Sequence, residues 1–161
     1  MAKKGIDINP NTVIIAGTAV FGLILARKIL ISAGLLGGPG ANRVQQQLTN
    51  PESPWKPTFW KNRTVGAILI RRAEAESYAK KIYDALNWYA DDTAAVNGVF
   101  TALKTQSQVS FLADVFFQLY NQDLLTYLQE GSDTFPWNGL SDDELLKLTN
   151  LVDRLPKYMP R

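Results

Sequence analysis

The stretch NTVIIAGTAVFGLILA, residues 11–26, contains no charged residue and only three polar side chains, those of Asn11, Thr12 and Thr18. A helix that is apolar all round has to be buried in a large core or in lipid. The rest of this 161-residue chain must therefore accommodate it in one of these two ways. We predict that the stretch anchors the protein in a membrane.

The length of this stretch is compatible with a single transmembrane helix, which needs about 20 apolar residues. Beyond Arg27 and Lys28 the chain continues as ILISAGLLGG, and long basic side chains near a helix end can reach the headgroups. We predict an anchor segment at residues 11–36, spanning the bilayer at about residues 10–30, after a polar N-terminus at residues 1–10. The predicted anchor side chains are Val13, Ile14, Ile15, Val20, Phe21, Leu23, Ile24 and Leu25, with Arg27 and Lys28 at the bilayer interface.

Two other interpretations of the stretch stay open. Lys3 and Lys4 followed by an apolar run are typical of a cleaved signal peptide, although Arg27 and Lys28 stand where a cleavage site would be expected. The stretch could also be a buried helix of a soluble protein. Within the predicted span, Thr18, Gly22 and Ala26 recur at four-residue spacing and could let a second helix pack closely, but small residues are common in membrane helices.

The composition excludes several classes of chemistry. The chain has no Cys and no His, which excludes disulfides, Fe–S clusters, Ser-His or Cys-His nucleophiles and nearly all zinc sites. Its net charge is only +2. We expect no cofactor, no metal and no nucleic-acid partner.

Residues 37–72 are predicted to form an extended linker rich in Gly, Pro and aromatic residues. GLLGGPG at residues 34–40 should break any helix, and the prolines of NPESPWKPTFWKNR, residues 50–63, favour extended backbone. Trp55 and Trp60, interleaved with basic residues, suit the headgroup layer of a bilayer. Alternatively, these aromatic side chains pack back on the domain as a strap.

From Ala73 onward the hydrophobic spacing predicts five helices in a bundle at residues 73–156, followed by a tail at residues 157–161. The first helix covers about residues 73–87, and Asp91 or Asp92 caps the second. Gln106 or Ser107 opens the third. The fourth stops at Gly131. The fifth begins with a capping box of Ser141 and Glu144 and ends before Pro156.

Residues 73–130 resemble one annexin-type repeat, and the whole segment is similar to single annexin-like domains of Bacteroidota proteins and their phages. The residues that match the repeat are Asp92 and Val96 in the second helix, Gln108 at the opening of the third, and Asp123, Leu124 and Leu128 at the close. The resemblance implies an all-α, annexin-like fold.

The calcium site that the resemblance would imply is not expected here. Annexin repeats bind calcium through a glycine-bearing loop, whereas this chain has Trp88 and Ala90 at the two glycine positions. These residues lack the backbone freedom of glycine. Glu130 lies near the position of the distant carboxylate, but one carboxylate without its loop is a poor calcium site.

The remaining candidate residues have simpler interpretations than catalysis. The acidic groups Asp91–Asp92 and Asp142–Glu144 could be paired carboxylates, but each stands at a predicted helix start, where a carboxylate stabilises the helix. Arg71–Arg72 and Lys80–Lys81 could form a basic face, yet Glu74, Glu76 and Asp84 interrupt it.

These observations predict a non-enzymatic, single-pass membrane protein whose helical domain docks on a protein partner. The resemblance favours a minor virion protein of a membrane-containing bacteriophage, with capsid or other virion proteins as partners and possible association with further copies of itself. A bacterial inner-membrane adaptor or assembly factor is the alternative, and a carboxylate-dependent hydrolase of cell-wall glycans is the third interpretation.

Overall fold

The computed structural model describes residues 39–63, 69–87, 92–131 and 138–158, all within one compact unit that ends at Arg161. These residues form an all-α fold without strands, containing the 3-10 turn η1 (Trp60–Arg63) and the helices α2 (Pro39–Thr49), α3 (Arg72–Leu86), α4 (Thr93–Ala102), α5 (Gln106–Tyr120), α6 (Leu124–Glu130) and α7 (Asp142–Arg154).

The predicted anchor at residues 11–36 lies outside the described residues, together with its interface residues Arg27 and Lys28 and its packing residues Thr18, Gly22 and Ala26. Among the helices that the structure describes, none is long and apolar enough to cross a bilayer. The predicted anchor therefore remains a prediction from the sequence.

The five helices expected after residue 72 are confirmed as α3 to α7, and their ends follow the predicted capping chemistry. The carboxylate of Asp92 accepts the Ala95 N–H at 2.9 Å at the start of α4. Gly131 ends α6 with a positive φ of 80°, a conformation that glycine adopts readily. At the start of α7, the Glu144 carboxylate accepts the backbone N–H of Ser141 at 2.9 Å, as a capping box requires.

The extended linker predicted for residues 37–72 is wrong at Pro39–Thr49, which form α2. Proline suits the first position of a helix because its missing N–H has no intrahelical partner there. Ala41 and Val44 are buried. Gly40 lies directly against the carbonyl of Asp142, so glycine allows α2 to approach the start of α7.

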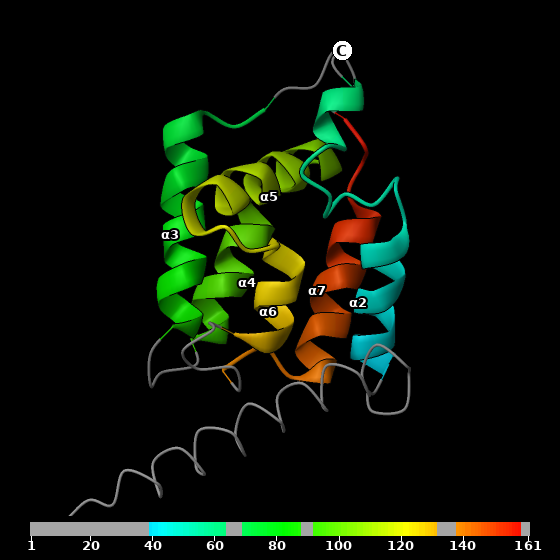
Figure 1. The fold of residues 1–161 in the computed structure, drawn as a ribbon, viewed down its shortest axis with the longest axis vertical. Helices are drawn as coiled ribbons and strands as arrows, with labels where there is room; N and C mark the ends of the chain where they lie inside the picture. The colour runs from blue at the N-terminus through cyan, green and yellow to red at the C-terminus, as the bar shows by residue number, and fades with distance from the viewer. Residues whose placement is uncertain (1–38, 64–68, 88–91, 132–137, 159–161) are drawn as a thin grey trace, which may run out of the picture. The chain divides into compact units, whose positions relative to one another are not determined.

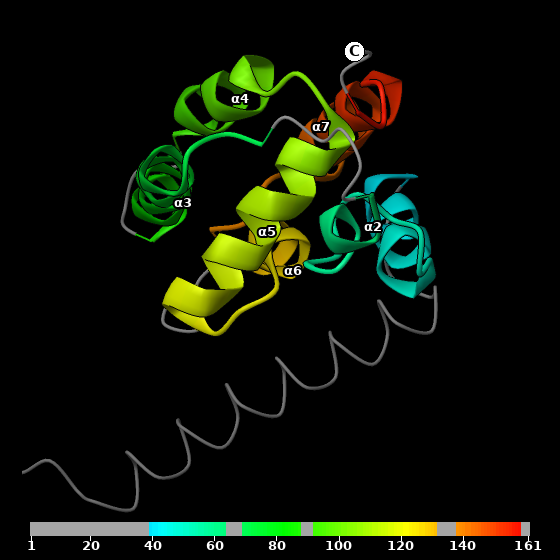
Figure 2. The ribbon, with the colours of Figure 1, turned by 90° about the horizontal axis from the view of Figure 1, so that it is seen from above.

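Helix α5 lies in the middle of the unit, between the α3–α4 pair and the α2–α7 pair (Figures 1 and 2). The α2 and α7 helices lie side by side and make the most extensive contacts of any helix pair that the structure describes. The core contains fully buried side chains from each of these helices and from α6, including Val44, Ile82, Phe100, Phe116 and Leu148. The fold is thus one layer of helices on each side of α5.

An aromatic cluster joins α3, α5 and α6 at the far end of α5. The rings of Tyr83 and Tyr120 are stacked with centroids 4.0 Å apart, and Phe116 packs 5.1 Å from Tyr127. The Tyr127 hydroxyl donates to the Tyr83 carbonyl at 2.8 Å. Burial raises the pKa of Tyr127 well above its usual range, so the Tyr127 hydroxyl keeps the proton that it donates to Tyr83.

Two glycines offer a matched test of the α2–α7 approach. A Cβ at residue 40 would lie 2.0 Å from the carbonyl oxygen of Asp142, whereas a Cβ at Gly98 would have as its nearest neighbour only the flexible Lys81 Nζ, at 3.9 Å. We expect Gly40→Ala to lower the free energy of unfolding by about 1–3 kcal/mol. Gly98→Ala should raise it by about 0.5–1 kcal/mol, because alanine favours the helix interior. Urea unfolding monitored by circular dichroism measures both values, and equal effects of the two substitutions would contradict the close approach.

Candidate functional site

The segment that follows α2 crosses over α5 as a strap, which we define as residues 50–63. Trp55 is 1% exposed and Phe59 is 2% exposed. The Trp55 ring lies 5.3 Å from that of Phe100 on α4. The strap is therefore inserted into the hydrophobic core at two aromatic side chains.

Two side chains of α5 hold the strap with hydrogen bonds. The Ser110 hydroxyl donates to the Lys56 carbonyl and accepts the Trp60 backbone N–H at 3.0 Å. One turn further along, the buried Asp114 carboxylate accepts the Trp60 indole N–H at 3.2 Å and pairs with Lys61 Nζ at 3.2 Å. These contacts fix both the backbone and the side chains of the strap on one face of α5.

The prediction that Trp55 lies in the headgroup layer is wrong, because its ring is enclosed by the core of the described unit. Trp60 is half-buried and packs edge-on against Phe111 with centroids 5.3 Å apart. With its indole N–H donated to Asp114, Trp60 is also engaged within the protein. The alternative that these aromatic residues form a strap is confirmed.

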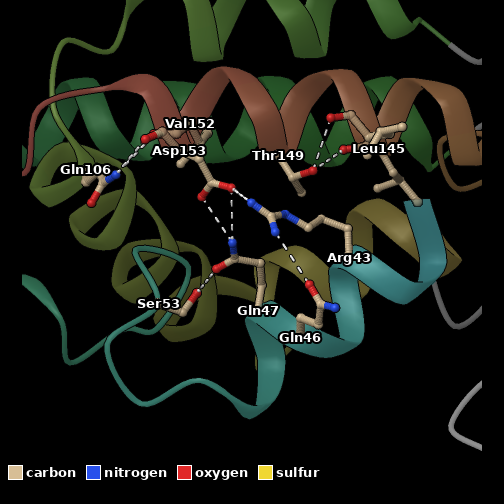
Figure 3. Close-up of polar contacts among 10 residues, drawn as sticks. Arg43, Gln46, Gln47, Ser53, Gln106, Leu145, Thr149, Val152 and Asp153 are labelled. Atoms are coloured by element: carbon tan, nitrogen blue, oxygen red, sulfur yellow. Dashed lines mark hydrogen bonds and ion pairs between the residues drawn. The ribbon is translucent and has the colours of Figure 1, made fainter. Parts of the chain in front are cut away.

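A cluster of polar side chains joins α2 to α7 (Figure 3). The Asp153 carboxylate pairs with the Arg43 guanidinium and accepts the Gln47 amide N–H at 3.0 Å. The Gln47 side-chain carbonyl accepts the Ser53 hydroxyl at 2.7 Å. Gln106 at the start of α5 donates to the Asp153 backbone carbonyl at 3.3 Å. The cluster therefore connects α2, the strap, α5 and α7.

The residues after α7 cap the N-terminus of α5. The Gln106 N–H donates to the Pro156 carbonyl at 2.9 Å, and the Ser107 N–H donates to the Lys157 carbonyl at 3.2 Å. The Ser107 hydroxyl donates to the same Lys157 carbonyl at 2.7 Å. Two backbone donors that the helix itself cannot satisfy are thereby paired.

The acidic residues considered for catalysis serve as helix caps where the structure describes them. Asp92 caps α4, while Asp142, Asp143 and Glu144 form the first turn of α7. The Ser141 hydroxyl donates to the Glu144 carboxylate at 2.7 Å. This hydrogen bond is the main reason why the pKa of Glu144 lies below its ordinary value. Asp91 lies outside the described residues. No cluster of three or more potential metal-ligating side chains occurs in the described ranges.

The basic residues of α3 are largely paired on the helix surface. Arg72 Nε lies 2.8 Å from Glu76, and Lys80 Nζ lies 2.8 Å from Asp84. Such exposed pairs, four residues apart, are typical of a solvated helix face. An open depression between α3 and α4 is lined by Ser77, Lys80, Lys81, Asp84, Ala85, Asp92 and Ala95. Among these residues, Lys80 pairs with Asp84 and Asp92 caps α4. These three polar groups are therefore used by the fold, and the depression does not present them for catalysis.

The residues that carry the annexin resemblance have packing and capping roles in this structure. Val96, Leu124 and Leu128 are fully buried. Asp123 accepts the Thr126 N–H at 3.0 Å at the start of α6, and Gln108 accepts the Lys104 N–H at 2.7 Å. Glu130 is the last residue of α6. Trp88 and Ala90 lie outside the described residues.

The large apolar side chains that are exposed within the described ranges are Phe117 and Leu119, near the end of α5, and Tyr158 in the tail. Phe117 and Leu119 are 45% and 46% exposed. Single exposed apolar side chains are common on folded proteins. We therefore infer no partner from them.

Comparisons with protein-family models, with curated proteins and with solved structures found no match to this chain. The annexin resemblance therefore stays a prediction.

The polar cluster around Asp153 predicts how much stability is lost when the Asp153 carboxylate is removed. Asp153→Ala leaves the Arg43 guanidinium and the Gln47 amide without their shared acceptor, and we expect a loss of about 1–3 kcal/mol in unfolding free energy. Glu76→Ala is the matched control, because it removes an exposed pair and should cost about 0.5 kcal/mol or less. Urea unfolding measures both, and equal costs would show that the cluster does not hold α2.

The capping box predicts a pH dependence of stability. The pKa of Glu144 is lowered from its ordinary value of 4.5, so its contribution is fully present above pH 4.5 and is lost as the pH falls through the folded-state pKa. Glu144→Gln keeps the box geometry without titrating. We expect the stability difference between wild type and Glu144→Gln to shrink below pH 4.5 in urea unfolding at several pH values. A constant difference would contradict the assignment.

Proposed function

We propose that this protein is a non-enzymatic, membrane-anchored structural protein whose helical unit docks on a protein partner. Within this class we propose a minor virion protein of a membrane-containing bacteriophage, linking the bilayer to a protein shell. The observation that carries the proposal is the uncharged stretch at residues 11–26, which precedes α2 by only 12 residues. Such a stretch is most stable when surrounded by acyl chains.

The described helical unit supports a docking role more than a catalytic one. The polar side chains of Asp114, Asp92 and Gln47 are used by the fold itself, as a strap contact, a helix cap and part of the α2–α7 cluster. Arg72 and Lys80 are paired with neighbouring carboxylates. An extended basic surface, which nucleic-acid binding relies on, is therefore not favoured on α3.

The phage part of the proposal rests on the resemblance to single annexin-like domains of Bacteroidota proteins and their phages. The alternative is a bacterial inner-membrane adaptor with the same architecture and a cellular partner. Immunodetection in purified virions and in host membrane fractions distinguishes them. Detection in virions at a fixed ratio to the coat protein supports the first proposal, and detection only in host membranes supports the alternative.

The anchor itself is tested by charge substitution. We expect the intact wild-type chain to stay in the membrane pellet after alkaline carbonate extraction. The double variant Val20→Arg with Ile24→Arg should move to the supernatant, because each charge at the centre of a span costs about 2.5–3.5 kcal/mol. The matched control, Gly5→Arg with Asn9→Arg, adds the same charge at the same spacing in the polar N-terminus and should stay in the pellet.

Two results would overturn the anchor. One is release of the intact wild-type protein into the carbonate supernatant. The other is an N-terminal sequence of the mature protein that begins after Ala26, as a cleaved signal peptide would give.

A further inference from the structure

Four cationic side chains around the start of α5 lie beyond ion-pair distance of every carboxylate that the structure describes. They are Lys56 on the strap, Lys104 just before α5, Arg154 at the end of α7 and Lys157 in the tail. Lys104, Arg154 and Lys157 are exposed, and Lys56 is half-buried. We call these four side chains the basic end.

Lys56 and Lys157 lie over neighbouring turns on one face of α5. The buried Ser107 hydroxyl donates to the Lys157 carbonyl at 2.7 Å. The buried Ser110 hydroxyl donates to the Lys56 carbonyl. Residues three apart on a helix have Cβ atoms only about 5–6 Å apart. The strap and the tail therefore meet at the start of α5, although about a hundred residues separate them in the sequence.

The same turn of α5 also holds the backbone next to the other two cations. The Lys104 N–H donates to the Gln108 side-chain carbonyl at 2.7 Å. The Gln106 amide donates at 3.3 Å to the carbonyl of Asp153, the residue before Arg154. All four segments of the basic end are thus fixed on α5 before any partner arrives. A surface whose backbone is already ordered loses less conformational entropy on binding.

Two carboxylates of the surrounding helix turns already have partners within the fold. Asp114 on α5 is buried and pairs with Lys61, and Asp153 on α7 pairs with Arg43. Neither of them offsets the charge of the basic end. Its cations are therefore available to a carboxylate or phosphate from outside the unit.

The basic end lies far from the point where the chain enters the described unit. Helices α2 and α7 begin at the same end, because Gly40 lies against the carbonyl of Asp142, and both run toward the opposite end (Figure 1). The 13 residues of α7 rise about 20 Å at 1.5 Å per residue. Arg154, at the end of α7, is thus about 20 Å from the start of that helix.

We propose that the basic end is the surface by which the helical unit docks on its protein partner, and that the partner presents Asp and Glu side chains there. This inference rests on the proposed function, which supplies both the anchor and the docking role. Only residues 37 and 38 separate the proposed anchor from Pro39. An anchored unit therefore has Pro39 near the bilayer and turns the basic end away from it.

A protein partner fits the basic end better than a nucleic acid or a lipid surface. Nucleic-acid binding relies on cations that follow many phosphates, whereas these four are confined to one end of α5, in a chain of net charge +2. Tyr158, which is 50% exposed, directly follows Lys157. A single exposed ring carries no inference alone, but tyrosine and arginine together are enriched in the cores of protein interfaces.

Binding of a fluorescein-labelled deca-glutamate peptide to the full chain tests the proposal, measured by fluorescence anisotropy in neutral detergent micelles at low ionic strength. We expect Lys104→Glu with Lys157→Glu to weaken binding about tenfold or more. Lys81→Glu with Lys147→Glu is the matched control, because these lysines are exposed and lie outside the basic end. Each replacement changes the charge by two, so both variants move from +2 to −2. The control should weaken binding less than about twofold.

Four results would overturn the proposal. The first is a wild-type chain that does not bind the peptide, and the second is an equal loss of affinity in the two double variants. The third is duplex DNA that binds more tightly than the peptide and depends on Lys104 and Lys157. The fourth is displacement of the peptide when phosphatidylserine is added to the micelles, which would make the basic end a lipid site.

Urea unfolding of both double variants checks that they fold, and we expect midpoints close to that of the wild type because the four lysines are exposed and unpaired. The peptide is measured on the solubilised chain, so its binding does not depend on membrane insertion. Failure of the anchor in carbonate extraction and failure of the basic end in this experiment are therefore distinguishable.

Discussion

The buried polar half of α5 is the constraint on which the rest of the unit depends. Every residue from Thr105 to Ser110 is buried, and so is Asp114 one turn later. Polar groups inside a protein cost free energy unless each one finds a hydrogen-bond partner. Helix α5 can supply few of these partners itself, so other segments of the chain must come to it.

Those partners arrive from both sides of α5 in the sequence. The strap supplies the partners of Ser110 and Asp114 from about 50 residues upstream. The end of α7 and the tail after it supply those of Gln106 and Ser107 from about 50 residues downstream. Apolar burial drives the helices together but is not directional. The hydrogen bonds on α5 therefore determine where the strap and the tail lie, which apolar burial alone would leave less well defined.

The sequence predicts the parts of this fold that depend on local chemistry. Helices α3 to α7 follow from 3.6-residue spacing and from caps such as Asp92, Gly131 and the Ser141 box. The sequence does not predict α2, because Pro39 and Gly40 are typical of a helix break. The need for glycine at residue 40 becomes clear only from the Asp142 carbonyl that lies against it. The burial of Asp114 cannot be predicted from the sequence either. A charged side chain in a helical pattern indicates an exposed face, and only the structure shows that the strap covers this one.

Helix α2 and the strap are attached to the rest of the described unit by apolar and polar contacts together. Trp55 and Phe59 are buried, and α2 makes its most extensive contacts with α7. The ion pairs of Arg43 with Asp153 and of Lys61 with Asp114 add polar contacts at the surface. Because apolar burial is not directional, it is these directional polar contacts that determine the register at which α2 lies on α7 and the strap lies on α5.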